Sequence, residues 1–211
     1  MALAADERSD FADLLETLTP DQWHAPTLCE GWDVRQLVAH VVSYDTAGPV
    51  AITANFLRAG FRPARVNDLQ MRSLADWTPE QLVGFLRSHL RPRGLTAGFG
   101  GGIGLSDCLI HHQDVRRPLG LHRNVPSDRL HAALGVALRA PVLPTRRNAA
   151  GLRLYATDLD WINGDGPEVT GPGEALLLAL TGRPAALEQL DGDGLDTLRS
   201  RLRTKSAEPR A

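Results

Sequence analysis

The segment that decides the fold reads DCLIHHQDVRRP and runs from Asp107 to Pro118. It follows a glycine-rich turn at residues 98–104, contains no proline before its last residue, and carries adjacent apolar residues at Leu109 and Ile110. This pattern predicts a helix of about three turns from roughly residue 103 to residue 117. No other part of the chain gathers as many side chains capable of chemistry.

Helical geometry predicts which of these side chains share a face. Asp107 and His111 are four residues apart and point the same way, Asp114 lies one turn further on, and His112 is rotated by about 100°. A carboxylate and an imidazole at this spacing can bind one divalent cation if a third ligand comes from another helix. His40 is the candidate third ligand. The sequence therefore predicts a metal site of His40, Asp107 and His111, with zinc as the first choice and nickel, iron or cobalt as alternatives.

The same residues also have a purely structural interpretation. His111 could be an ordinary hydrogen-bonded helix residue, with Asp107 paired to an arginine, because Asp-x-x-x-His pairs are common in helices. Asp114 could be a fourth ligand, an acceptor for the second nitrogen of a metal-bound histidine, or an ion-pair partner of Arg116 or Arg117. We favour the ion pair.

The remaining candidate residues are assigned no chemistry. His112 is expected on the flank of the helix rather than at a metal. Cys29 and Cys108 are expected to be small buried hydrophobic residues, because neither has an activating neighbour in the sequence. The glycine-rich turn lacks the lysine of a P-loop and the spacing of a dinucleotide motif. Packing is also the expected role of Trp23 and Trp32, and turn-rich or polar surroundings give no role to His24, His89, His122 and His131.

Composition excludes several classes of protein. The formal net charge of −2 argues against an electrostatic nucleic-acid binder, which usually has a basic face. No apolar run of about 18 residues is present, so no membrane span is expected. Polar residues near the N-terminus do not resemble a secretory signal, which predicts a cytoplasmic protein. Two cysteines are too few for a disulfide framework or a zinc site of four thiolates.

Apolar periodicity and capping residues predict five helices in the first two thirds of the chain. Asp33 is a plausible N-cap with Gln36 as its capping-box partner, and Thr78 has the same relation to Gln81. A bent continuation of the second helix to Leu57 is left open by the sequence. The predicted helices span residues 6–19, 33–44, 78–90, 103–117 and 127–139.

The pattern changes after Pro141 and Pro144, and we expect a domain boundary within residues 140–150. Residues 1–143 are predicted to form a helix bundle, residues 144–204 a small α/β domain, and residues 205–211 a disordered tail. The fold class is therefore mainly α. Within the small domain the expected elements are a strand at 151–157, a turn at 163–167, a short strand at 168–170, a helix at 174–181 and a helical stretch from residue 195.

Two motifs carry a resemblance to a known family. Trp23 with PTLCEGWDVRQLVAH at residues 26–40, and DCLIHHQDVRRPLG at residues 107–120, resemble the mycothiol-dependent maleylpyruvate isomerase family of the DinB-like metal-binding superfamily. Residues 152–182 are similar to the small α/β domain that follows the bundle in many members. The resemblance covers essentially the whole chain. It implies a DinB-like, up-and-down helix bundle.

The resemblance also implies a metal site. In the family a divalent metal, typically zinc, is held by a histidine and an acid-x-x-x-His pair, which match His40, Asp107 and His111. The isomerase has a glutamate where this chain has Asp107, so the shorter side chain is expected to shift the metal or weaken its binding.

The function implied by the resemblance is metal-assisted use of mycothiol, a low-molecular-weight thiol. Metal coordination would deprotonate the thiol, and the thiolate would attack a small electrophile. In an isomerase the addition is reversible, and in a transferase the thiol stays attached. No protein side chain beyond the metal ligands is expected to be catalytic. An arginine of the small domain contributes in the isomerase, and Arg153 and Arg183 are unranked candidates for it.

Other functions remain open from the sequence. One alternative is a non-catalytic metal-binding or stress-related sensor protein. Another is a bundle whose metal site has lapsed and which only mediates assembly. The expected partners are a small-molecule thiol and an electrophilic substrate, with no nucleic acid and no membrane; an oligomer is left open.

Overall fold

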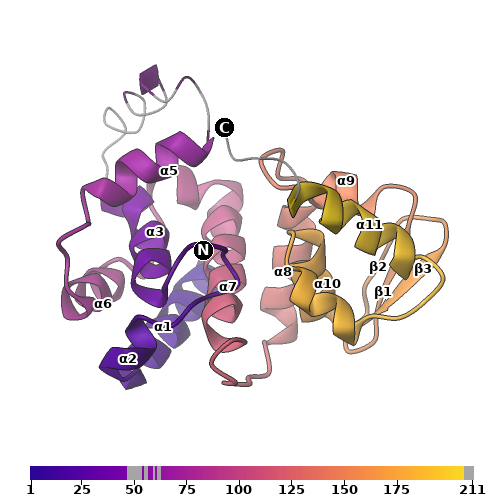
Figure 1. Ribbon diagram of the computed structural model, residues 1–211, viewed down its shortest axis with the longest axis horizontal. Helices are drawn as coiled ribbons and strands as arrows, with labels where there is room; N and C mark the ends of the chain where they lie inside the picture. Colours follow the sequence, from indigo (N-terminus) through magenta and orange to yellow (C-terminus); the bar gives the residue numbers. More distant parts are fainter. Residues whose placement is uncertain (47–53, 55–56, 59, 61–62, 207–211) are drawn as a thin grey trace. The chain divides into compact units, whose positions relative to one another are not determined.

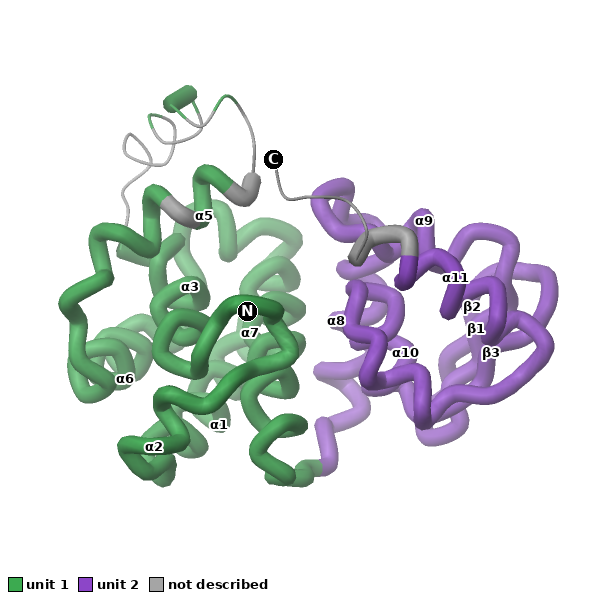
Figure 2. The backbone as a smooth tube through the Cα atoms, in the orientation of Figure 1, with its two compact units in different colours: residues 1–123 green, residues 124–211 purple. Residues whose placement is uncertain are grey.

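The computed structural model describes residues 1–46, 54, 57–58, 60 and 63–206 (Figure 1). The chain forms two compact units, Met1–Arg123 and Asn124–Ala211 (Figure 2). The bent continuation expected towards Leu57 falls almost entirely outside the described residues.

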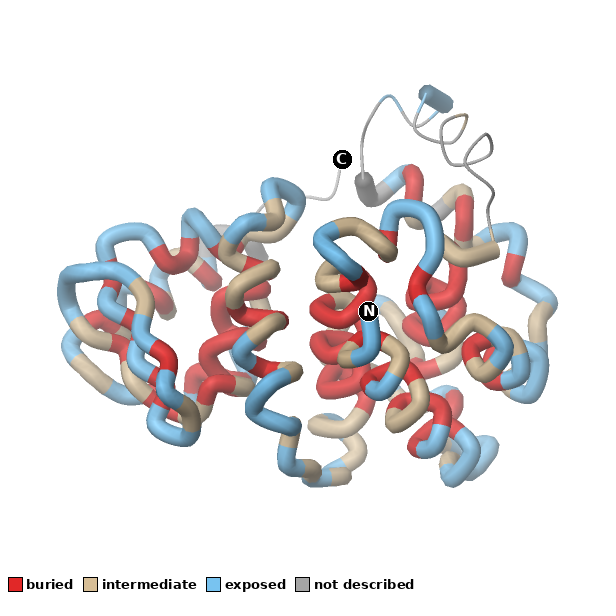
Figure 3. Tube along the Cα trace, turned by 180° about the vertical axis from the view of Figure 1, so that it is seen from behind, coloured by how far each residue is buried: buried red, intermediate tan, exposed pale blue. Residues whose placement is uncertain are grey.

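The regular elements described in the first unit are all helices. Its elements are α1 (Ala2–Thr17), α2 (Pro20–Trp23), α3 (Val34–Thr46), α5 (Pro63–Arg72), α6 (Pro79–Ser88) and α7 (Gly102–Arg116), with short 3-10 turns at Gly94–Ala97 and Phe99–Gly101. Helix α7 packs against α1 and α3, and α3 also packs against α5 and α6. Buried residues are concentrated where these helices meet (Figure 3).

Local capping explains where two of these helices begin. The Thr78 hydroxyl accepts a hydrogen bond from the Gln81 backbone N–H, and the Gln81 side chain accepts one from the Thr78 N–H. Asp33 and Gln36 make the same reciprocal pair, at 2.7 and 3.0 Å, before α3. Both capping boxes predicted from the sequence are therefore present, because they depend only on residues three apart.

Helix α7 is buried on nearly all sides. Eleven of its fifteen residues are buried, including the polar residues Ser106, His111, His112, Gln113 and Asp114. A helix in this environment cannot leave its polar groups to water, so each must find a partner inside the protein or bind a ligand. Helix α7 is therefore the element best suited to carry a functional site.

The second unit combines helices with a three-stranded sheet. The strands β1 (Arg153–Ala156), β2 (Ile162–Asn163) and β3 (Glu168–Gly171) lie in the order β2-β1-β3, with β1 antiparallel to β2 and parallel to β3. Gly164, with a φ of 78°, makes the turn after β2, where a Cβ atom would lie 2.4 Å from the Leu152 carbonyl oxygen. The helices are α8 (Ser127–Ala137), α9 (Thr145–Ala149), α10 (Gly173–Leu180) and α11 (Leu195–Ser206), with a 3-10 turn at Pro184–Gln189.

The structure confirms the predicted fold class, a mainly helical chain with a small C-terminal α/β part. The division into units falls after Arg123, whereas the prolines placed the expected boundary within residues 140–150. Helix α8 lies with the second unit because it packs against α10. Helix α11 continues to Ser206, two residues into the expected tail. None of the described helices combines the length and the apolar character needed to cross a membrane.

Candidate metal centre

His40 lies on α3 and faces α7. Its side chain is buried, and its ring centroid lies 5.0 Å from that of Trp32, 5.0 Å from that of His111 and 5.8 Å from that of Tyr44. Asp107 and His111 stand one turn apart on α7. Because α3 and α7 pack together, residues far apart in the sequence meet at this point.

The spacing of the donor atoms is that of a cation site. His40 Nε2 lies 3.8 Å from Asp107 Oδ1, and His111 Nε2 lies 3.6 Å from the same oxygen. One ligand atom from each of the three residues lies within 4.8 Å of the other two. These separations are too long for hydrogen bonds. Donor atoms that share one tetrahedral zinc ion at about 2.0–2.1 Å are about 3.3–3.5 Å apart, so the two distances to Asp107 would need only a small contraction.

Asp107 supplies a second indication of a cation. Its Oδ2 atom is buried and has no hydrogen-bond partner among the described residues. Burial raises the pKa of this carboxyl group, but the neighbouring His40 and His111 outweigh burial and lower it, so the group is ionised. A buried carboxylate oxygen without a partner is energetically unfavourable. The donor set therefore fits a divalent metal, which would supply the missing partner.

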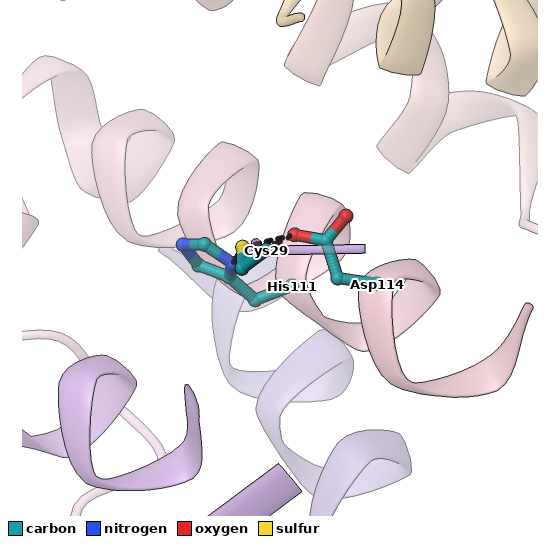
Figure 4. A group of neighbouring side chains, drawn as sticks. All are labelled: Cys29, His111 and Asp114. Carbon is teal, nitrogen blue, oxygen red and sulfur yellow. Dashed lines mark hydrogen bonds and ion pairs between the residues drawn. The ribbon is translucent and has the colours of Figure 1, made fainter. Parts of the chain in front are cut away.

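The other edge of the His111 ring has a different environment. Its Nδ1 atom lies 2.9 Å from Asp114 Oδ2, and the Cys29 thiol donates to the same oxygen at 3.1 Å (Figure 4). Cys29 Sγ is 3.7 Å from His111 Nδ1. Burial lowers the pKa of His111, but the hydrogen bonds to Asp114 and Cys29 outweigh it and raise the pKa to about 10. This second group also offers three potential ligand atoms, but two of its contacts have hydrogen-bond lengths.

The structure thus brings the three predicted ligands together and shows contacts of Asp114 and of the two cysteines. Asp114 contacts His111 Nδ1 with one carboxylate oxygen, as expected of an acceptor for the second nitrogen of this histidine. Cys29 packs against the hydrophobic core as expected, but it is only half-buried and its thiol is hydrogen-bonded. Cys108 is fully buried, and burial raises the pKa of its thiol. The sequence around Cys29 does not predict its hydrogen bond to Asp114, because 85 positions separate the two residues.

His112 is also placed differently from the expectation. The flank of α7 on which it lies is fully buried, and its Nδ1 lies 2.9 Å from Glu7 Oε1 on α1. Arg116 Nε donates to His112 Nε2 at 2.8 Å, and Arg123 Nη2 donates to Glu7 Oε2 at 2.7 Å. Burial raises the pKa of Glu7, but His112 and Arg123 together lower it to about 2. Burial also lowers the pKa of His112 to about 4, so the pair is a carboxylate and a neutral imidazole.

This buried network makes a testable contribution to stability. Glu7→Gln is expected to lower the free energy of unfolding by about 1–3 kcal/mol, because the amide removes the charge that partners Arg123. Urea unfolding followed by circular dichroism measures the loss. Glu16→Gln is the matched control: this exposed glutamate on the same helix pairs with Arg87 at the surface, and its loss should be smaller. Equal losses in the two variants would contradict a stabilising role for the network.

The two arginines considered for the small domain have partners within their own unit. Arg153 Nε lies 3.3 Å from Glu168 Oε2, and Arg183 Nη1 donates to the Thr181 carbonyl oxygen at 2.9 Å. These contacts give no reason to prefer Arg153 or Arg183 as the contributing arginine. A catalytic role for either stays a prediction.

Comparison with known proteins gives one family and one fold. Residues 4–93 match the family model described as the mycothiol maleylpyruvate isomerase N-terminal domain, a region that contains His40 and ends before α7. A mutant of the mycothiol-dependent maleylpyruvate isomerase has a similar solved structure, with a TM-score of 0.60, 15% sequence identity, and coverage of 91% of this chain and 90% of that one. Another crystal structure of that isomerase gives a TM-score of 0.53 at the same identity and coverage. No curated protein matches the chain. The resemblance seen in the sequence is thereby confirmed, and at this identity the solved structures establish the fold alone.

Proposed function

We propose that this chain, whose residues 4–93 match the mycothiol maleylpyruvate isomerase N-terminal domain, is a divalent-metal-dependent and mycothiol-dependent isomerase or transferase acting on a small electrophile. The observation that supports it best is the set of donor atoms of His40, Asp107 and His111, spaced for one cation around a carboxylate with a partnerless buried oxygen. Zinc is the metal we propose, because two imidazoles and one carboxylate are ligands that zinc accepts.

The proposed ligands leave room for a further one. Three protein ligands do not complete even a tetrahedral site, so one position stays open for an exogenous group. A bound divalent metal would lower the pKa of a thiol in that position, giving a thiolate at neutral pH. With a single carboxylate among the ligands, the site would retain positive charge and favour an anionic thiolate.

The surrounding side chains indicate that the nucleophile comes from outside the protein. The Cys108 thiol is fully buried, and burial raises its pKa. Tyr44 cannot serve as a general base at neutral pH, because burial and then the Asp107 charge raise its pKa to about 12. Its hydroxyl instead donates to Asn67 Oδ1. Neither group supplies a reactive anion at neutral pH, which favours an external thiol.

The chemistry we propose is reversible addition. The thiolate adds to one carbon of a conjugated double bond, rotation follows about the resulting single bond, and elimination of the same thiolate restores the double bond in the other configuration. No oxidant or reductant is consumed. In a transferase the adduct would instead be protonated on carbon and released with the thiol attached.

The test is an activity assay with zinc-loaded protein, mycothiol and maleylpyruvate, the substrate named for the structural relatives. We expect cis–trans isomerisation that requires both zinc and mycothiol and that is lost in His40→Ala. Nuclear magnetic resonance identifies the isomer, and mass spectrometry detects a thiol adduct if the protein is a transferase. Stoichiometric zinc binding without turnover of this or other conjugated electrophiles would contradict the enzymatic proposal and favour a non-catalytic metal-binding protein. Location in the cytoplasm stays a prediction.

A further inference from the structure

The two nitrogens of the His111 ring face different groups. Nε2 lies 3.6 Å from Asp107 on the side of His40, while Nδ1 lies 2.9 Å from Asp114, which is fully buried. Figure 4 shows Nδ1 directed at Asp114 and Cys29 and the other ring nitrogen pointing away from both. We propose that Asp114, assisted by Cys29, is a positioning residue that fixes the His111 ring so that Nε2 is the metal-binding atom. This inference rests on the proposed metal site.

Hydrogen-bond chemistry determines which ring nitrogen carries a proton. An ionised carboxylate only accepts hydrogen bonds, so the close contact requires a proton on Nδ1 of His111. The Cys29 thiol donates to the same Asp114 oxygen at 3.1 Å and helps to hold the carboxylate in place. Neutral His111 is then confined to the tautomer whose lone pair is on Nε2, the atom that faces Asp107 and His40.

Asp114 also anchors the loop that contacts the other imidazole. Its backbone carbonyl oxygen accepts a hydrogen bond from Leu28 N–H at 3.1 Å, which ties the loop between α2 and α3 to α7. Within that loop Trp32 N–H donates to the Cys29 carbonyl oxygen at 3.0 Å, and the Trp32 ring lies against His40. Asp114 therefore contacts His111 directly and also anchors the loop whose Trp32 ring lies against His40.

A second cation site at Cys29, His111 and Asp114 explains the distances less well. A sulfur and an oxygen that share a tetrahedral zinc ion are about 3.5 Å apart, whereas Cys29 Sγ and Asp114 Oδ2 are 3.1 Å apart. The 2.9 Å contact from His111 to Asp114 is likewise that of a hydrogen bond. Direct ligation would also require Nδ1 to lose its proton.

Cobalt substitution distinguishes the two roles of Cys29. If Cys29 is only a hydrogen-bond donor, the cobalt(II) protein will show no thiolate-to-cobalt charge-transfer absorption, and Cys29→Ser will bind cobalt with the same stoichiometry. A charge-transfer band that disappears in Cys29→Ser would show direct ligation and overturn the proposal.

Substitution of Asp114 tests the positioning role. We expect Asp114→Ala to weaken zinc binding by about tenfold to a hundredfold, the usual effect of removing an outer-shell partner. The affinity is extrapolated to high pH, because loss of the carboxylate also reduces proton competition at His111. Asp114→Asn keeps an acceptor for Nδ1–H and should recover most of the affinity. The control is Asp45→Asn, which alters another buried carboxylate, the partner of Arg8, and should leave zinc affinity unchanged. Unchanged affinity in Asp114→Ala would overturn the proposal.

A measurement without metal separates this inference from the proposed function. In metal-free protein, ¹H–¹⁵N spectra of the imidazoles should show a slowly exchanging Nδ1–H signal from His111, lost in Asp114→Ala and retained in Asp45→Asn. Absence of that signal in the unsubstituted protein would overturn the positioning contact. Its presence in a protein that binds no zinc would leave the contact supported and refute the metal site.

Discussion

Replacing His111 with alanine is expected to reduce bound zinc from about one ion per chain to a trace, because two protein ligands rarely hold zinc. The remaining donors would be His40 and Asp107, whose closest atoms are 3.8 Å apart. Metal analysis after dialysis against a weak chelator measures the content, and calorimetric titration measures the affinity. Isomerase activity should be lost together with the metal.

A second variant is needed because His111→Ala also removes the contact to Asp114. His40→Ala leaves that contact intact and should lose the metal equally. His24→Ala is the matched control, because it removes a histidine that lies before α3 and whose side chain is 74% exposed. Its zinc content should equal that of the unsubstituted protein. Retention of wild-type metal content by both His40→Ala and His111→Ala would show that the ligands have been misassigned.

Much of the fold could be predicted because its signals are local. The start of α3 depends on Asp33 and Gln36, three residues apart, and α7 follows from the apolar spacing and the absence of proline before Pro118. The Asp107–His111 pair likewise depends only on helical periodicity. The sequence offered His40 as the third ligand only as a candidate, and the family resemblance added support for it, because periodicity does not say which helices touch.

The features that the sequence did not reveal depend on long-range packing. Glu7 and His112 are 105 positions apart in the sequence. Each has the polar character of a residue on a helix surface, and they form a buried network only because α1 packs on α7. Cys29 and Asp114 meet in the same way. The prolines at 141 and 144 mark turns inside the second unit, not its border, because α8 buries its apolar residues against α10.

Zinc affinity is expected to rise steeply with pH through neutrality. Burial lowers the pKa of His111, but Asp114 and Cys29 raise it to about 10, so the metal-free ring is protonated at neutral pH. Zinc must displace the proton on Nε2, and binding therefore releases it. The affinity should increase by about tenfold per pH unit until the pH approaches 10, giving about a hundredfold between pH 7 and pH 9. A histidine with the ordinary pKa of 6.5 would add almost nothing over this interval.

The measurement is zinc titration against a competing chelator of known affinity, at a series of pH values. Asp107 is ionised throughout, because its pKa is lowered, and adds no proton to the balance. In Asp114→Asn the rise should level off at a lower pH, since this substitution removes the strongest support for the protonated ring.

The stability of the metal-free protein provides an independent check of the direction of the His111 pKa shift. A pKa that is raised in the folded state contributes stability below about 6.5, and that stability is lost as the pH rises through about 10. A zinc affinity that is constant above pH 7 in the unsubstituted protein would show that His111 is already neutral there and that its contacts do not raise its pKa.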